Sequence, residues 1–92
     1  MIKSFKCRET RALAAGEPVK RFGSIDIVTK RKLRQLQISE NLNDLRIPPG
    51  NHLEALKGTR VGQYSIRIND QWRICFTWSE AGAEDVEIVD YH

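Results

Sequence analysis

The sequence ends in VEIVDYH, and the side chains of Asp90, Tyr91 and His92 can each hold or transfer a proton. Two arginines, Arg67 and Arg73, lie upstream in the segments YSIRI and WRICFTW. A guanidinium group matches the oxygens of a phosphate. Cleaving RNA without a metal needs a base for the 2′-hydroxyl, cations for the charge that builds on the phosphate, and an acid for the leaving oxygen. These residue types therefore suit a phosphodiester substrate.

Three segments in the second half of the chain alternate apolar and polar residues, as strands do when one face is buried. They are YSIRI (64–68), WRICFTW (72–78) and VEIVDYH (86–92). Connections at 69–71 and 79–85 predict a three-stranded antiparallel meander. The first connection places Ile66 opposite Ile74 and all apolar residues of this hairpin on one face, whereas a slip of one residue would expose half of them.

The same register places polar side chains on the opposite face. Arg67 lies across from Arg73, which is unfavourable unless an anion compensates the two charges. If the second hairpin keeps this parity, Tyr91 lies on the same face, one strand beyond Arg73. Lys57 and Arg60, in the segment LKGTR, can be brought to this face by the connection. We therefore predict an anion site here, although arginine stems also cover their neighbours on an ordinary solvated face.

The first half of the chain is expected to supply helices that cover the apolar face of the sheet. Residues 1–6 are strand-like, and residues 10–15 form a weak helical turn that ends at Gly16. A longer helix is predicted over residues 24–37, with Ser24 as its N-cap. Helices packed on one face of an antiparallel sheet make an α+β fold.

Charge is unevenly distributed along the chain. Residues 1–36 hold ten Lys and Arg against three Asp and Glu, whereas residues 37–92 hold five against nine. A basic block of this kind suggests nucleic acid as a partner, although a solvated helix face has the same composition. The candidate RNA-contacting residues in this block are Lys20, Arg21, Lys30, Arg31, Lys32 and Arg34.

Length and composition set further limits. We expect the 92 residues to form one domain spanning residues 1–92, with a small core and little room for an enclosed cofactor. There is no apolar run of the roughly 20 residues that span a bilayer and no signal peptide, so we expect a cytoplasmic protein. Cys7 and Cys75 are expected to be buried thiols. His52 and His92 lack metal-ligand spacing, so neither a metal nor a cofactor is predicted.

The stretch PPGNHLEALKGTRVGQYSIRINDQWRICFTW and the ending VEIVDYH resemble the HigB branch of the RelE/ParE toxin superfamily, the killer proteins of plasmid-maintenance systems. The opening MIKSF also fits, so the resemblance covers nearly the whole chain. It implies a compact toxin, two helices against a curved sheet, that cleaves mRNA on translating ribosomes. It also implies a HigA-like helix-turn-helix antitoxin that binds the toxin and represses the operon at its operator DNA.

The resemblance also implies roles for individual residues. Those that match the family's LKG, QWR and terminal DYH motifs are Lys57, Arg73, Asp90, Tyr91 and His92. Proton transfer is the implied role of the terminal motif. Glu54 stands where some members have a histidine, three residues before the lysine of LKG. A carboxylate there could act as a base, but it is ionised at neutral pH and donates no proton readily. The assignment of acid and base stays open.

Two other functions fit parts of the sequence. A ParE-like inhibitor of DNA gyrase would act through protein contacts and would need no proton-transfer groups at the end of the sheet. An RNA-binding module usually presents stacking aromatics on an open sheet face, whereas Trp72, Phe76 and Trp78 share the apolar face. We therefore predict a metal-independent mRNA endoribonuclease, with ParE-like inhibition as the alternative.

Overall fold

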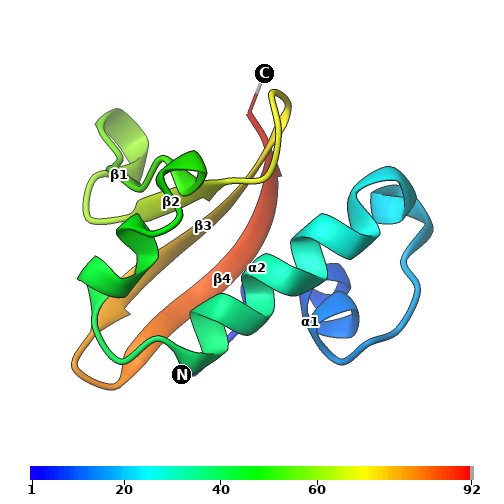
Figure 1. The fold of residues 1–92 in the computed structure, drawn as a ribbon, viewed down its shortest axis with the longest axis horizontal. Coiled ribbons are helices and arrows are strands. Elements are labelled where there is room, and N and C mark those ends of the chain that lie inside the picture. The colour runs from blue at the N-terminus through cyan, green and yellow to red at the C-terminus, as the bar shows by residue number, and fades with distance from the viewer. Residues whose placement is uncertain (92) are drawn as a thin grey trace.

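A computed structural model describes residues 1–91 as two α-helices packed against one antiparallel sheet (Figure 1). α1 spans Arg8–Ala14 and α2 spans Asp26–Ile38. The sheet order is β1-β2-β3-β4, and the strands are Glu54–Ala55, Tyr64–Arg67, Trp72–Ser79 and Gly82–Asp90. Short 3-10 helices lie between these elements: η1 (Lys20–Ile25), η2 (Leu42–Arg46), η3 (Pro49–Asn51) and η4 (Gly58–Arg60). The predicted α+β fold is confirmed.

The meander has the register that the alternation predicted. Ile66 pairs with Ile74, and Arg67 pairs with Arg73, between β2 and β3. Arg73 in turn pairs with Val89 of β4. Tyr91, two residues further along, therefore lies on the same face of the sheet as Arg73, as the predicted parity requires. The register is fixed because the alternating apolar residues are buried or partly buried on the other side of these strands.

The connection between β3 and β4 is shorter than the predicted loop at 79–85. β4 already begins at Gly82, which pairs with Ser79, so a two-residue turn joins the strands. The small and acidic residues that suggested a loop continue the strand instead, because the N-terminal segment gives them a second partner. The N–H of Ala83 donates to the carbonyl of Met1 at 2.8 Å. A bulge further along β3 adjusts the register.

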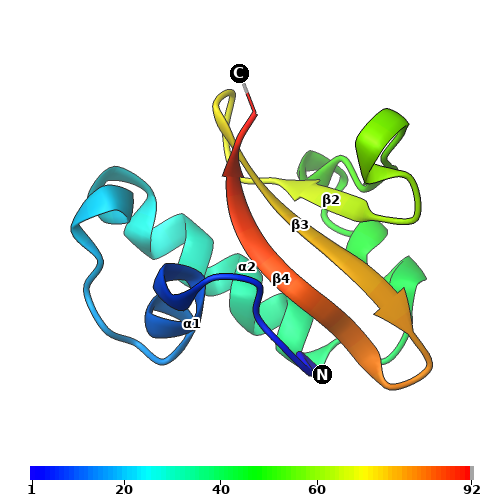
Figure 2. The ribbon, with the colours of Figure 1, turned by 180° about the vertical axis from the view of Figure 1, so that it is seen from behind.

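The N-terminal segment lies along the outer edge of β4, in the parallel direction (Figure 2). The strand predicted at residues 1–6 consists of two isolated bridges, formed by Ile2 and Phe5. Gly82 has φ +127, and a Cβ atom there would lie 2.0 Å from the carbonyl oxygen of Met1, so this approach requires glycine. The segment covers what would otherwise be an open sheet edge.

The core lies between the helices and the apolar face of the sheet. Its most buried side chains are Leu13, Phe22, Leu33, Leu36, Ile66, Ile74, Phe76, Val86 and Ile88. α2 begins at Asp26, and Ile25 occupies the N-cap position without a side-chain cap, so the prediction of Ser24 as N-cap was wrong. The preceding residues wind into η1 instead, and this buries Phe22 and Ile25.

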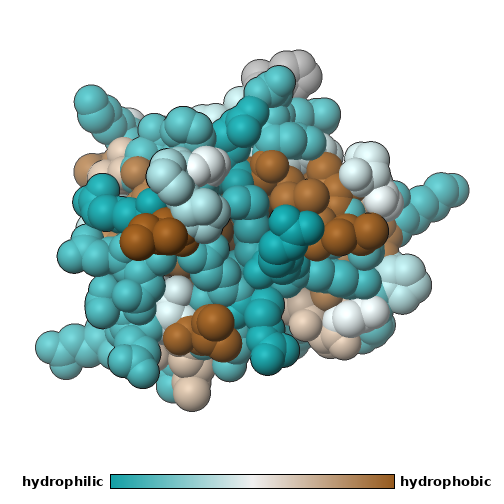
Figure 3. All heavy atoms as spheres, viewed as in Figure 1, coloured by the Kyte–Doolittle hydropathy of each residue, from teal (hydrophilic) through white to brown (hydrophobic). Residues whose placement is uncertain are grey.

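The surface over α2 is mostly hydrophilic, with hydrophobic side chains in separate patches (Figure 3). Ile27 and Ile38 of α2 are among the exposed ones. No helix in residues 1–91 is long and apolar enough to cross a membrane.

Candidate active site

The predicted proximity of Tyr91 and Arg73 is confirmed. The Cζ atom of Arg73 lies 5.9 Å from the centre of the Tyr91 ring. Arg73 pairs with Val89, so Tyr91 is its diagonal neighbour on the face opposite the core. The N–H of Tyr91 donates to the carbonyl of Gln71 at 2.6 Å, which extends the ladder past the last residue of β4. The chain is therefore held in register up to Tyr91.

Several candidate residues border an open hollow of about 450 Å³ at this end of the sheet. Its lining residues are Lys57, Thr59, Arg60, Val89, Asp90 and Tyr91. They come from the end of β4 and from η4, two segments far apart in the sequence. Lys57 and Tyr91 thus bring an ammonium and a phenol to one space, and the carboxylate of Asp90 at its border accepts a hydrogen bond from Nε2 of Gln71 at 3.1 Å. The role predicted for His92 stays a prediction, because this residue lies outside the described part of the chain.

A larger hollow of about 680 Å³ lies between α1, α2 and the N-terminal segment. Its floor is apolar, with Phe5, Leu13 and Leu33 among the lining residues. Arginines and a lysine border it, but no candidate acid, base or C-terminal residue does. We therefore place the candidate active site at the sheet and not in the larger hollow.

Arg73 is held tightly by its neighbours. Its side chain is 12% exposed. Its Nε donates to Oγ of Ser65 at 2.7 Å, and its Nη2 donates to the carbonyl of His52 at 2.7 Å. The same Nη2 lies 3.5 Å from Oε1 of Glu54. Within residues 1–91, Nη1 forms no hydrogen bond.

Arg67 shares a rung of the ladder with Arg73, but its head group turns away. It pairs with Asp70 in the hairpin connection. Glu54 of β1 lies beside Arg73, so each of the two arginines has a carboxylate partner of its own. The repulsion between Arg67 and Arg73 is thus compensated by carboxylates of the protein itself. We had predicted that the two guanidinium groups would share one anion, whereas each of them faces a different carboxylate.

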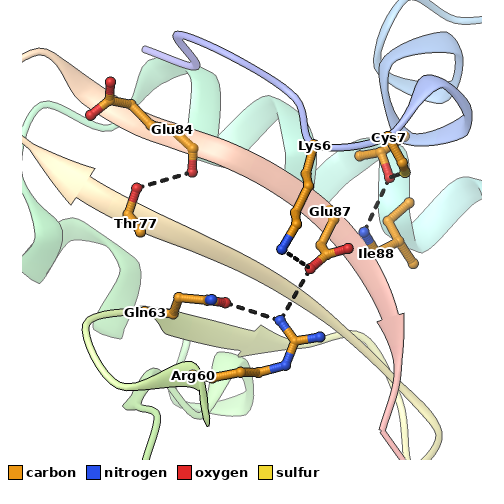
Figure 4. Close-up of polar contacts among 9 residues, drawn as sticks. Lys6, Cys7, Arg60, Gln63, Thr77, Glu84, Glu87 and Ile88 are labelled. Carbon is orange, nitrogen blue, oxygen red and sulfur yellow. Dashed lines mark hydrogen bonds and ion pairs between the residues drawn. The ribbon is translucent and has the colours of Figure 1, made fainter.

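Arg60 connects η4 to β4 (Figure 4). Its Nη1 lies 3.1 Å from Oε1 of Glu87, and Lys6 of the N-terminal segment lies 3.7 Å from the same oxygen. The hydrogen bond to Glu87 raises the pKa of Arg60. Cys75 is fully buried nearby, and its burial raises the pKa of the thiol, which keeps it neutral. Lys57, in contrast, is exposed and has no acidic partner among the described residues.

The basic residues of the first half do not form one surface. Three of them are engaged within the protein: Arg21 pairs with Glu9, Lys30 pairs with Asp26, and Lys32 donates to Asn51. Arg31 and Arg34 border the larger hollow, and Lys20 is exposed at the start of η1. The predicted basic cluster is thus divided: Lys30, Arg31 and Arg34 border the larger hollow, whereas Lys32 contacts Asn51, the residue before His52.

Two residues of the site were missed in the sequence. Ser65 and Asn51 are both fully buried, and each accepts a hydrogen bond from a cationic side chain. The strand register could have indicated Ser65, because it lies diagonal to Arg73 on the same face. No periodic pattern indicates Asn51, which lies in an irregular connection. No group of three His, Cys, Asp or Glu side chains within residues 1–91 could hold a metal ion.

Comparison with known proteins identifies the family. Residues 20–92 match the family model of HigB-like toxins, described as the RelE-like toxin of the type II toxin-antitoxin system HigB. Toxin HigB-1 of Vibrio cholerae serotype O1 is 45% identical over 60 residues, which cover 65% of this chain and 63% of that protein. An uncharacterized protein of Haemophilus influenzae is 49% identical over 51 residues, covering 55% and 50%. The aligned part is less than two thirds of each relative. Because the family model matches most of the chain, the protein belongs to the HigB-like family of RelE-like toxins.

Proposed function

We propose that this toxin is a metal-independent endoribonuclease that cleaves mRNA on translating ribosomes. The observation that carries the proposal is the shared hollow of Lys57, Asp90 and Tyr91, with the guanidinium of Arg73 beside the Tyr91 ring. These groups are a cation for the phosphate and side chains that can move protons, which RNA cleavage requires. An inhibitor that acts through protein contacts alone has no need of them.

In the proposed reaction, the 2′-oxygen of a ribose attacks the adjacent phosphorus and the bond to the 5′-oxygen breaks. The products are a 2′,3′-cyclic phosphate and a 5′-hydroxyl. One proton leaves the 2′-hydroxyl for a base, and another passes from an acid to the 5′-oxygen. Lys57 offsets the charge that builds on the phosphate, because it borders the hollow without a carboxylate partner in residues 1–91. Arg73 contributes through Nη1.

We assign the proton transfers to Asp90, Tyr91 and His92. Asp90 and Tyr91 border the same hollow as Lys57, and His92 follows them directly in the sequence. Glu54 has a different role in this proposal, because its carboxylate lies against Arg73.

The proposed partners follow from the family. A type II toxin is encoded with an antitoxin, and we propose a HigA-like helix-turn-helix protein in that role, with operator DNA bound only through the antitoxin. The ribosome supplies a positioned mRNA, which reduces what the small site must contribute by itself. Lys20, Arg31 and Arg34 remain candidates for contacts with ribosomal RNA, since they have no ion-pair partner in the described part of the chain.

The test is to map cellular mRNA ends after induction of the toxin, beside a DNA gyrase supercoiling assay. Cuts linked to codons in translated regions are expected, with normal supercoiling. Intact mRNA together with cleaved DNA would overturn the proposal in favour of ParE-like inhibition.

Variants locate the activity in the chain. Arg73→Ala, or a chain that stops after Asp90, is expected to fold and bind the antitoxin but not to arrest growth. Arg46→Ala is the matched control, because it removes the same charge from an exposed turn, where Arg46 donates a hydrogen bond to Oδ1 of Asn43. Full growth arrest by both site variants would show that the chemistry lies elsewhere.

A further inference from the structure

The connection between α2 and β1 contains a buried amide side chain. Asn51, at the end of η3, has no exposed surface. Its Nδ2 donates to Oε1 of Gln35 at 3.0 Å and to the carbonyl of Leu45 at 3.1 Å. Its Oδ1 accepts from Nζ of Lys32 at 2.5 Å. The side chain is therefore bound on both ends, and two of its three partners come from consecutive turns of α2.

The two α2 residues hold this connection at more than one point. Nε2 of Gln35 also donates to the carbonyl of Ile47 at 2.5 Å. Burial lowers the pKa of Lys32, and nearby Arg31 and Arg67 lower it further. Lys32 thus reaches from α2 to η3, where Oδ1 of Asn51 accepts a hydrogen bond from its ammonium.

The next residue along the chain contacts the candidate active site. His52 has φ 44 and ψ 55, a left-handed conformation that is uncommon for a residue with a side chain. Its N–H donates to the carbonyl of Pro49 at 3.0 Å, and its carbonyl accepts from Nη2 of Arg73 at 2.7 Å. β1 begins only at Glu54, so no strand pairing fixes the peptide of His52. Its neighbour Asn51 is anchored by three side-chain hydrogen bonds.

We propose that Asn51 is a positioning residue: held by Lys32 and Gln35 of α2, it fixes the His52 carbonyl, which in turn orients the guanidinium of Arg73. Removing the amide side chain frees the His52 peptide to leave the left-handed conformation. Nη2 of Arg73 then loses a hydrogen bond, while the bond from Nε to Ser65 remains, because Ser65 belongs to β2. The expected loss of cleavage rate rests on the proposed function, whereas the expected loss of the hydrogen bond between Arg73 and His52 does not.

The direct test is NMR of the Arg73 side chain in the purified toxin, with its signals assigned through Arg73→Lys. In the wild type, restricted rotation about the Nε–Cζ bond is expected to give separate signals for the two Nη groups. Asn51→Ala is expected to merge these signals into one, while the Nε–H stays protected from exchange by Ser65. Separate, unchanged Nη signals in Asn51→Ala would overturn the inference.

A matched control separates positioning from general loss of stability. Leu13→Ala also truncates a fully buried side chain, but in α1, on the core side of the sheet. It is expected to lower the melting temperature without merging the Nη signals, and merging there as well would overturn the inference. If Asn51→Ala does not fold, Asn51→Asp keeps the shape and the Lys32 contact but loses both Nδ2 donors, and the same change in the Nη signals is expected.

A cleavage assay on translating ribosomes separates this inference from the proposed function. Asn51→Ala is expected to lower the rate of cleavage by about the same factor as Arg73→Lys, with little change in ribosome binding. A wild-type rate in Asn51→Ala, despite merged Nη signals, would overturn the catalytic half of the inference. If the wild type itself cleaves nothing while the Nη signals respond as expected, the proposed function fails and the positioning role stands.

Discussion

Glu54→Gln tests whether the carboxylate beside Arg73 takes a proton or compensates a charge. Oε1 of Glu54 lies 3.5 Å from Nη2 of Arg73. At that separation, two unit charges attract by about 5 kcal/mol at an effective dielectric constant of about 20, and by about 1 kcal/mol in water. The Glu54 side chain is 53% exposed, so the lower figure applies. We expect the substitution to cost less than about 1 kcal/mol of folding free energy.

The effect on activity distinguishes the two roles. Removing a general base lowers a rate by about 100-fold to 10,000-fold. Because Arg73 keeps its bonds to Ser65 and His52, we expect Glu54→Gln to change the cleavage rate on ribosomes by less than about tenfold, well below the loss of a base. The assay is single-turnover cleavage, with urea unfolding as the measure of stability. A loss of 100-fold or more, in a variant as stable as expected, would refute our reasoning and make Glu54 the base.

Other substitutions test the remaining parts of the site. Lys57→Met is expected to abolish cleavage without lowering stability, since the lysine is exposed and has no acidic partner in residues 1–91; retained cleavage would remove Lys57 from the site. Arg60→Ala is expected to cost about 1.5–3 kcal/mol in urea unfolding, because its partner Glu87 is largely buried. Arg67→Ala, whose partner Asp70 is 99% exposed, is expected to cost less than about 1 kcal/mol, and an equal cost for both would contradict this ranking. The pKa of Cys75 is raised in the folded chain, so the contribution of its buried thiol is complete below the unfolded pKa of about 8.5. This contribution is lost as the pH rises above that value, so the melting temperature of the wild type is expected to fall at alkaline pH. In Cys75→Ala, the melting temperature is expected to fall less steeply over the same pH range.

The sheet could be predicted from the sequence because its register has one solution. Over residues 64–68 and 72–78, every second residue is apolar, and a slip of one position would expose half of this set. The position of Tyr91 beside Arg73 follows from this parity once β3 and β4 are paired. Local patterning sufficed here because strand pairing repeats the same contact along its length.

The parts that could not be predicted depend on single contacts between distant segments. β1 has two residues, too few for a period, yet it brings Glu54 to Arg73. The guanidinium of Arg67 points to Asp70 of the turn, and the strand register does not determine this direction. Asn51 gave no signal, because its role depends on how α2 packs over an irregular connection.

The charges of the site explain why the proposed reaction needs a ribosome. Arg73 faces Glu54, and Arg60 faces Glu87, so both guanidinium groups already have a carboxylate. Among the catalytic candidates in residues 1–91, Lys57 is the cation without an acidic partner. One uncompensated contact with a phosphate gives little affinity for a free single strand, because binding grows with the number of phosphates neutralised. A site of this kind can place a proton and a charge at a phosphate that is presented to it, but it cannot gather an mRNA from solution. In the proposed reaction, the ribosome supplies the position of the substrate and the toxin supplies the chemistry.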